Sequence, residues 1–249
     1  MTYNHYMFGT HVYILYIVTY LRLIHAFDVI KPVFITGATS KVGQRVVEKI
    51  AMRGLRTRCL VRDHSKDYGM FQGLYGVEMV QGDILDTDTL NHIMKGCSMS
   101  VNLHGVLRKS NPLKKSYSHL PENDRDHPYY VNYVGMQNII DSCNENDIPR
   151  LIRLTGLATG LPSWHPVPLF FDSFYSDNIY WHRRGESEIM SSDLNYTILR
   201  PGGIKDKEFK TVTLKEEMTS PPGLIGVDNL AKVVVQRLVN LTLNNFELS

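Results

Sequence analysis

The segment from Val33 to Gly43, Val-Phe-Ile-Thr-Gly-Ala-Thr-Ser-Lys-Val-Gly, constrains the fold of this chain more than any other part. It opens with a short apolar run, Val33 to Ile35, which indicates a buried strand. A turn with Gly37 follows, and from Val42 to Ile50 the apolar residues recur at the spacing of one helix face. The order strand, glycine turn, helix is typical of an α/β protein in which the start of the helix binds an anion.

Two glycines and one serine define the turn. Gly37 allows a sharp bend, and Gly43 allows the helix to lie close to the strand. Where a third glycine would let a pyrophosphate approach the backbone, the chain has Ser40, whose N–H and hydroxyl can still bind a phosphate although its Cβ takes up space. The spacing fits a dinucleotide-binding loop and an ordinary strand-to-helix turn alike.

Composition limits the alternatives. The chain has 249 residues, of which 43% are hydrophobic and 21% charged, and this fits one α/β domain. The formal net charge of +2 is too small for an electrostatic nucleic-acid binder, so we expect no nucleic-acid partner. The three cysteines are far apart and indicate buried thiols. The ten histidines show no metal-binding spacing, so we expect no metal site.

Residues 1–30 form an apolar extension before the first expected strand. Residues 7–27 are mostly apolar and aromatic, yet this is short for a membrane span of about 20 apolar residues, and basic residues are missing before it. A targeting segment, a membrane anchor and an extra helix packed on the domain all stay open. We expect membrane contact, if there is any, only through residues 7–27, and a cytoplasmic or organellar location.

Further strand-like segments alternate with helical ones and end in small or polar residues. The expected strands are residues 57–61 before Arg62-Asp63, residues 77–80 before Gly82-Asp83-Ile84, residues 100–103 before His104-Gly105, and residues 151–155. Alternating strands and helices predict an α/β fold with a doubly wound parallel sheet. Such sheets bind their ligands at the carboxyl ends of the strands.

Arg62 indicates which dinucleotide the chain binds. It is the first residue after the second strand, where the adenosine ribose of a dinucleotide would lie. An acid there favours NAD, whereas an arginine accommodates the 2′-phosphate of NADP. Lys41 adds a positive charge nearby, so we expect NADP, while Asp63 leaves NAD open. A solvated charge at a strand end is the simpler alternative for Arg62.

Two other stretches lack clear periodicity. Residues 108–128 are polar and fit a mobile surface loop or a lid over the ligand. Residues 157–180 are rich in aromatic residues and prolines and follow the fifth strand. They line a substrate pocket, pack against a partner subunit or belong to the core. A monomer and a homodimer both stay open.

Several motifs resemble those of one family. They are Ile-Thr-Gly-Ala-Thr-x-x-Val-Gly, Leu-Val-Arg-Asp, Gly-Asp-Ile, Val-Asn-Tyr-Val-Gly-Met-Gln-Asn-Ile-Ile-Asp and Leu-Asn-Tyr-Thr-Ile-Leu-Arg-Pro-Gly-Gly. Together they resemble the atypical short-chain dehydrogenase/reductases of the NmrA-like, NAD(P)H-binding type, over residues 32–249. The resemblance implies a Rossmann-type NAD(P)-binding domain at residues 31–249 with a small, substrate-facing C-terminal region.

The resemblance also implies a cofactor site. Its expected residues are Gly37, Thr39, Ser40, Lys41, Val42 and Gly43 for the pyrophosphate, Arg62 for the 2′-phosphate, Asp83 and Ile84 for the adenine, and His104 and Gly105 beside the nicotinamide ribose.

Reductases of this family carry a Tyr-x-x-x-Lys pair, in which the lysine holds the ribose and lowers the pKa of the tyrosine. In this chain the pair is altered. One register gives Tyr180 and Arg184. The other register, which is slightly better supported, gives Asn178 and His182. Thr155 fits the place of a hydroxyl that orients the substrate, although a strand-end threonine bonded to the backbone is an equal alternative. Thr155, Tyr180, His182 and Arg184 are therefore the candidate catalytic residues.

The altered pair leaves two classes of function open. The first is an NADP-dependent oxidoreductase that acts on a small carbonyl, quinone or enone substrate. The second is a non-catalytic NAD(P)-binding redox sensor or assembly factor. A simpler interpretation of Arg183, Arg184, Glu186 and Glu188 is a solvated helix face with local ion pairs.

Overall fold

The computed structural model describes residues 31–67, 69–110, 124–215 and 223–243, and the side chains of residues 240–243 are not described. The predictions for residues 1–30, including the segment 7–27, lie outside the described residues, as does most of the polar stretch 108–128. In the described part, no helix combines the length and the apolar character that crossing a membrane requires.

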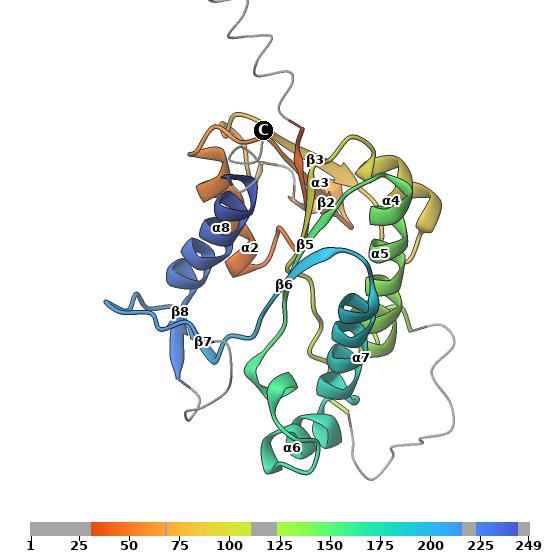
Figure 1. The fold of residues 1–249 in the computed structure, drawn as a ribbon, viewed down its shortest axis with the longest axis vertical. Coiled ribbons are helices and arrows are strands. Elements are labelled where there is room, and N and C mark those ends of the chain that lie inside the picture. The colour runs from red at the N-terminus through yellow and green to blue at the C-terminus, as the bar shows by residue number, and fades with distance from the viewer. Residues whose placement is uncertain (1–30, 68, 111–123, 216–222, 244–249) are drawn as a thin grey trace, which may run out of the picture. The chain divides into compact units, whose positions relative to one another are not determined.

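Six parallel strands form the central sheet in the order β3-β2-β1-β4-β5-β6 (Figure 1). The strands are β1 (Val33–Thr36), β2 (Thr57–Val61), β3 (Val77–Gln81), β4 (Met99–Asn102), β5 (Arg150–Leu154) and β6 (Asn195–Leu199). The chain adds β2 and β3 on one side of β1, and it then adds β4, β5 and β6 on the other side. The carboxyl edge between β1 and β4 is therefore the place where such a sheet binds its ligand. The predicted doubly wound, Rossmann-type sheet is confirmed.

Helices cover both faces of the sheet (Figure 1). One face carries α2 (Lys41–Ala51) and α8 (Val227–Leu243), and the other carries α4 (Thr87–Met94), α5 (Gly135–Glu145) and α7 (Asn178–Ser191). Neighbouring side chains of a strand point to opposite faces. For this reason Ile35 belongs to the apolar core on the α2 side, whereas Phe34 belongs to the core on the α5 side.

The remaining elements lie around the carboxyl edge of the sheet or lead into the helices. They are α3 (His64–Asp67), the π-helix η2 (Tyr129–Val134), the 3-10 helix η3 (Leu157–Gly160), α6 (Pro166–Phe174), and the strands β7 (Gly203–Lys205) and β8 (Leu224–Gly226). The pair β7 and β8 forms a separate two-stranded sheet, which is the predicted small C-terminal region.

The structure confirms the prediction for the cysteines and excludes one alternative for the aromatic stretch. Cys59, Cys97 and Cys143 are buried and unpaired, as expected. In α6 the large apolar side chains of Leu169 and Phe170 are exposed, so this part of the aromatic stretch does not belong to the core of the described chain.

Candidate functional site

The turn between β1 and α2 requires glycine at two positions. Gly37 has a φ of +70°, and a Cβ at this residue would lie 2.6 Å from the backbone of Leu103 and His104. A Cβ at Gly43 would collide with the carbonyl oxygen of Gly37. The loop is therefore pressed against the end of β4, and α2 is pressed against the loop.

Ser40 is the N-cap of α2. Its hydroxyl donates to the carbonyl oxygen of Gly37 at 2.8 Å and accepts from the amide of Gly43 at 3.0 Å. Its own amide also donates to Gly37. The expectation that Ser40 offers its N–H and hydroxyl to a phosphate therefore does not fit this arrangement, because the loop itself uses both. The serine instead stabilises the start of the helix.

The first turn of α2 leaves two backbone donors for another acceptor. The first intrahelical hydrogen bond runs from the amide of Gln44 to the carbonyl oxygen of Ser40, at 2.8 Å. The amides of Lys41 and Val42 precede this bond and have no acceptor within the helix. Because the positive end of the helix dipole lies at the same place, this turn suits a phosphate.

A cleft of about 390 Å³ lies above this turn. It is bounded by the glycine loop, by the ends of β4 and β5, by α7 and by residues 204–206. Seven of the residues predicted for the site line it: Ser40, Lys41, Val42, His104, Gly105, Thr155 and His182. The structure thus brings the expected pyrophosphate loop and part of the expected catalytic set together around one cavity.

The residues predicted for the adenosine end lie outside this lining. Arg62 follows β2, and its Nη1 lies 2.5 Å from a carboxylate oxygen of Asp126. Asp83 pairs with Arg125 at 3.1 Å. Ile84 packs close to the backbone of α5, where a Cβ on Gly135 would collide with its side chain. The two charged side chains predicted for the adenosine end, Arg62 and Asp83, thus have the partners Asp126 and Arg125.

Asp63, the residue that leaves NAD possible as the cofactor, forms hydrogen bonds next to α3. One of its carboxylate oxygens accepts from the hydroxyl of Ser65 at 2.6 Å and from the amides of Ser65 and Lys66 at 3.1 and 3.2 Å. The hydrogen bond from the Ser65 hydroxyl, followed by that from the Lys66 amide, lowers the pKa of Asp63. This carboxylate is therefore ionised and used locally.

His104 follows β4, and both of its ring nitrogens are bonded inside the protein. Arg153 Nη1 lies 3.0 Å from His104 Nε2, and a guanidinium can only donate, so Nε2 accepts. The proton of the neutral ring is then on Nδ1, which lies 2.6 Å from the hydroxyl oxygen of Thr36. Burial, followed by the charge of Arg153, lowers the pKa of His104 well below its ordinary value. His104 is therefore a neutral imidazole held in one tautomer.

Only one of the α7 candidates reaches the cleft. His182 lines it, whereas Tyr180 is 48% exposed and contacts the ring of Trp181 at 4.7 Å between centroids. Arg184 donates to the hydroxyl of Tyr133 at 3.4 Å. In a helix, residues four apart share a face and residues two apart do not. The structure therefore does not bring Tyr180 and Arg184 to Thr155, and it favours the register with His182.

The environment of His182 determines its charge. Burial, followed by the nearby guanidinium of Arg153, lowers the pKa of His182 to about 3. The imidazole is therefore neutral at physiological pH. It cannot replace the positive charge of a lysine at this position, but either ring nitrogen can accept or donate a hydrogen bond.

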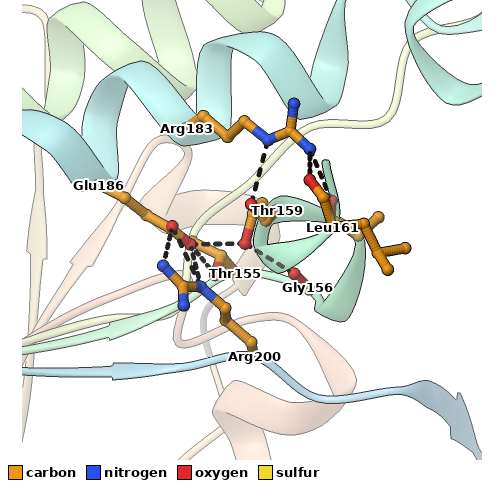
Figure 2. A network of polar contacts seen from close by, with 8 residues as sticks. Thr155, Gly156, Thr159, Leu161, Arg183, Glu186 and Arg200 are labelled. Carbon is orange, nitrogen blue, oxygen red and sulfur yellow. Dashed lines mark hydrogen bonds and ion pairs between the residues drawn. The ribbon is translucent and has the colours of Figure 1, made fainter. Parts of the chain in front are cut away.

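Glu186 was missed as a residue of the site. Figure 2 shows its carboxylate between Thr155, Thr159 and Arg200. It accepts from the two threonine hydroxyls at 2.5 and 2.8 Å and pairs with Arg200 at 2.6 Å. Glu186 is only 2% exposed, so its interpretation as part of a solvated helix face is wrong. The available signal was its spacing, since it follows His182 by four residues and shares the inner face of α7.

Arg183 fixes the loop that follows β5. Its Nε donates to the carbonyl oxygen of Thr159 at 3.0 Å (Figure 2). Its Nη1 donates to the hydroxyl of Ser163 at 2.7 Å. Further bonds reach the carbonyl oxygens of Ala158 and Leu161. Arg183 is thus a structural link between α7 and η3, and the solvated-face interpretation is wrong for this residue as well.

Comparison with protein families decides the assignment. The family described as NAD(P)H-binding matches residues 37–240, from the glycine turn into α8. The chain belongs to the NAD(P)H-binding family. Its resemblance to the atypical short-chain dehydrogenase/reductases is confirmed, and the family accounts for a glycine loop at the carboxyl edge of a parallel sheet.

Three relatives illustrate the range of similarity. An uncharacterized chloroplastic protein of Arabidopsis thaliana is 27% identical over 215 residues, which cover 84% of this chain and 72% of that protein. Protein TIC 62, chloroplastic, of the same plant is 24% identical over 188 residues, which cover 70% of this chain and only 27% of that protein. Sanguinarine reductase of Eschscholzia californica is 25% identical over 235 residues, which cover 83% of each protein.

A solved structure shares the fold. The anaerobillin reductase ChuY of Escherichia coli O157:H7 superposes with a TM-score of 0.62 at 20% identity, covering 84% of this chain and 90% of that one. At this level of identity the likeness concerns the architecture of the domain.

Proposed function

We propose that this protein is an NADP-dependent oxidoreductase that transfers hydride to or from a small, partly apolar carbonyl, quinone or enone. One observation carries the proposal: a single cleft is lined by the first turn of α2, the ends of β4 and β5, and His182. Family membership supports the nucleotide part of this proposal, and a relative named sanguinarine reductase supports the redox part.

The residues present fit a nicotinamide dinucleotide. At Gly37 and Gly43 the backbone packs so closely that a Cβ would collide with it. The amides of Lys41 and Val42, which have no acceptor within the helix, suit the pyrophosphate of the cofactor. When bound, this cofactor supplies or accepts the hydride. The chain itself orients the two reactants, and orientation accounts for much of the rate of such reactions.

We assign the substrate end of the cleft to Thr155 and His182. Thr155 donates its hydroxyl proton to Glu186. The lone pairs of the Thr155 oxygen can therefore accept hydrogen bonds from other donors. His182 is neutral and orients a substrate by hydrogen bonding rather than by charge. Tyr180 and Arg184 have no role in this proposal, because they lie on the other face of α7.

Arg62 supports NADP over NAD. Its guanidinium is exposed at the end of β2, where a 2′-phosphate would accept charge-assisted hydrogen bonds. The competing acid, Asp63, already accepts three hydrogen bonds around α3. It is therefore less available for the ribose hydroxyls by which an acid selects NAD.

A melting experiment tests this proposal. We expect NADPH to raise the melting temperature more than NADH, and Arg62→Glu to abolish or reverse this preference. Arg53→Glu is the matched control, because it makes the same charge change at the far end of α2. Equal shifts from the two nucleotides would remove the NADP preference. If neither nucleotide produces heat in a calorimeter, the whole proposal is wrong.

A second function is favoured by the position of Tyr180. A cleft without the tyrosine and lysine pair suits a protein that binds NADP without turning it over, as a redox sensor or assembly factor. If bound NADPH is never oxidised by a panel of quinones, aldehydes and enones, this second function replaces the first.

The names of the relatives suggest a location. The first relatives are named as chloroplastic proteins, so we place this protein in an organelle. Expression of the full chain with a fluorescent protein at its carboxyl end tests this, since diffuse cytosolic fluorescence would contradict it. A small-molecule substrate is its proposed partner.

A further inference from the structure

Three side chains beside the cleft have buried polar atoms without a hydrogen-bond partner among the described residues. They are Asn132, with both atoms of its carboxamide, Arg153, with Nη2, and His182, with Nδ1. Asn132 is 0% exposed and Arg153 only 1%. Buried polar groups are nearly always hydrogen-bonded, because leaving them unpaired is unfavourable. Several such atoms close together indicate a place for a polar ligand.

The three residues come from different elements; Asn132 and His182 lie next to Gly105, and Arg153 donates to the carbonyl oxygen of the preceding residue, His104, at 2.9 Å. Asn132 lies in η2, Arg153 in β5 and His182 in α7. A Cβ added to Gly105 would lie 3.8 Å from Asn132 Oδ1 and 3.6 Å from His182 Nε2. Gly105 itself lines the cleft. We call Asn132, Arg153 and His182 the polar pocket; Asn132 and His182 lie next to the space that a side chain at Gly105 would fill.

The polar pocket has an excess of donors and a positive charge. Among the unpaired atoms, Arg153 Nη2 and Asn132 Nδ2 can only donate a hydrogen bond, and Asn132 Oδ1 can only accept one. Arg153 donates to the ring and the carbonyl oxygen of His104, and none of its described hydrogen bonds reaches a carboxylate. Burial lowers the pKa of Arg153 to about 10, which still leaves it protonated at neutral pH. Such a pocket suits a negatively charged oxygen.

The same end of the cleft lacks a side chain that releases a proton near neutral pH, as far as the described residues show. His104 and His182 are already neutral, and Thr155 donates to Glu186. Reduction of an aldehyde or ketone gives a strongly basic alkoxide, which needs an acid in the site. Reduction of a quinone gives the weakly basic monoanion of a hydroquinone, which needs only stabilisation of its charge.

We propose that the polar pocket binds a carbonyl oxygen of a quinone and stabilises the negative charge that this oxygen gains on reduction. This inference rests on the proposed function. The quinone gains two electrons and one proton as a hydride from the reduced nicotinamide, and its oxyanion then takes the second proton from water. Asn132 and His182 donate to the oxygen, and Arg153 supplies the compensating charge.

An equilibrium titration tests the pocket without turnover. The probe is 2-hydroxy-1,4-naphthoquinone, which is an anion at neutral pH and absorbs visible light. It is titrated into the full chain with and without saturating oxidised NADP, and its absorption band and heat are recorded. We expect Gly105→Ala to weaken its binding about tenfold, the effect of losing one charge-assisted hydrogen bond. The added methyl group meets its neighbours at ordinary contact distances, so the variant should fold.

Gly156→Ala is the matched control, because a Cβ at that residue meets no atom within 4 Å. We expect it to bind the probe like the natural protein. Arg153→Met separates charge from shape: the anionic probe should bind about tenfold more weakly, and neutral 1,4-naphthoquinone should change less than about threefold. The melting shift caused by NADP shows that each variant is folded.

Three outcomes would overturn the inference. Equal affinities of Gly105→Ala and Gly156→Ala would mean that the pocket holds water only. Equal losses of the charged and the neutral quinone in Arg153→Met would remove the role of charge. If a cationic N-methylquinolinium binds as tightly as the anionic probe, the positive charge of the pocket likewise has no role in binding. If the natural protein binds no NADP, the proposed function fails; if it binds NADP and these differences are absent, only the quinone pocket fails.

Discussion

The guanidinium of Arg62 lies 2.5 Å from the carboxylate of Asp126, at the strand end where the sequence predicts the 2′-phosphate of NADP. Both side chains are largely exposed, at 74% and 66%. Exposed ion pairs of this kind contribute little to stability. The carboxylate therefore competes with a phosphate for Arg62 without strongly holding it.

Asp126→Asn should strengthen binding of NADPH. The neutral amide no longer competes for Arg62, so we expect the affinity for NADPH to rise about threefold, a typical effect of one exposed charge pair. The affinity for NADH should stay the same, because it lacks the 2′-phosphate. Isothermal titration at low salt measures both, and the gain should shrink at high ionic strength, where exposed charges are screened.

Glu208→Gln serves as the control for this change in charge. Glu208 pairs with Lys232 at 2.7 Å, and both side chains are about as exposed as those of the Arg62 pair. We expect it to leave both affinities unchanged. If Asp126→Asn strengthens NADH and NADPH equally, Asp126 does not compete with the 2′-phosphate.

Glu186→Gln should destabilise the domain. Glutamine keeps the shape and an acceptor for Thr155 but removes the counter-charge of Arg200. We expect the free energy of unfolding to fall by about 2–3 kcal/mol, as when a hydrogen-bonded buried ion pair loses one charge. For a domain of this size this corresponds to a melting temperature about 5–10 °C lower. Urea unfolding and a thermal scan measure the two quantities.

Glu188→Gln is the control for Glu186→Gln. Glu188 lies two residues further along α7, on the other side of the helix, and is only half-buried. We expect it to change the free energy of unfolding by less than about 0.5 kcal/mol. A similar loss in both variants would show that the network in Figure 2 does not carry the effect.

His182 should make the stability depend on pH. Its folded-state pKa is lowered to about 3, whereas an unfolded histidine titrates near 6.5. Between these values the unfolded chain binds a proton that the folded chain does not. The stability is therefore complete above about pH 6.5 and falls as the pH falls, by up to about 1.4 kcal/mol per unit. His104, whose pKa is also lowered, adds to this slope.

Urea unfolding at pH 7, 6 and 5 measures the slope. His182→Gln removes the titrating group, so its free energy of unfolding should fall less steeply between pH 6 and 5 than that of the natural protein. His92→Gln, at an exposed position of α4, should keep the natural slope. A parallel loss in all three proteins would mean that His182 is protonated in the folded state.

Most of the fold follows from local sequence patterns. The predicted helix from Val42 to Ile50 is observed as α2, with Val42 and Ile50 buried as the periodicity required. The predicted strand at residues 57–61 is observed with the same bounds. The parallel order of the strands also follows, because helices between strands force parallel crossovers. The capping bond from the amide of Gly43 to the hydroxyl of Ser40 is equally local, but it was not predicted.

The buried polar contacts of the site could not be predicted from the sequence. Arg153 lies within an apolar strand, and its partner His104 precedes it by 49 residues. Arg200 follows Glu186 by 14 residues, after a strand has been added to the sheet. No local spacing tells which distant groups a buried charge will meet, because tertiary packing decides it. For the same reason the partners of Arg62 and Lys41 appeared only in the structure.

Asp206→Asn should strengthen binding of both nucleotides. Asp206 follows β7 and pairs with Lys41 of the glycine loop at 2.9 Å, and both residues line the cleft. Because Lys41 lies beside the loop expected to hold the pyrophosphate, which NADH and NADPH share, its release should raise both affinities by the same factor, about two to three.

The contrast with Asp126→Asn makes this last prediction specific. One carboxylate would compete with the phosphates common to both nucleotides, and the other with the phosphate that only NADPH carries. In the double variant the two gains for NADPH should add as free energies, since the two ion pairs share no residue. Isothermal titration of the four proteins with both nucleotides measures this. If Asp206→Asn favours NADPH alone, Lys41 belongs to the 2′-phosphate site instead of the pyrophosphate loop.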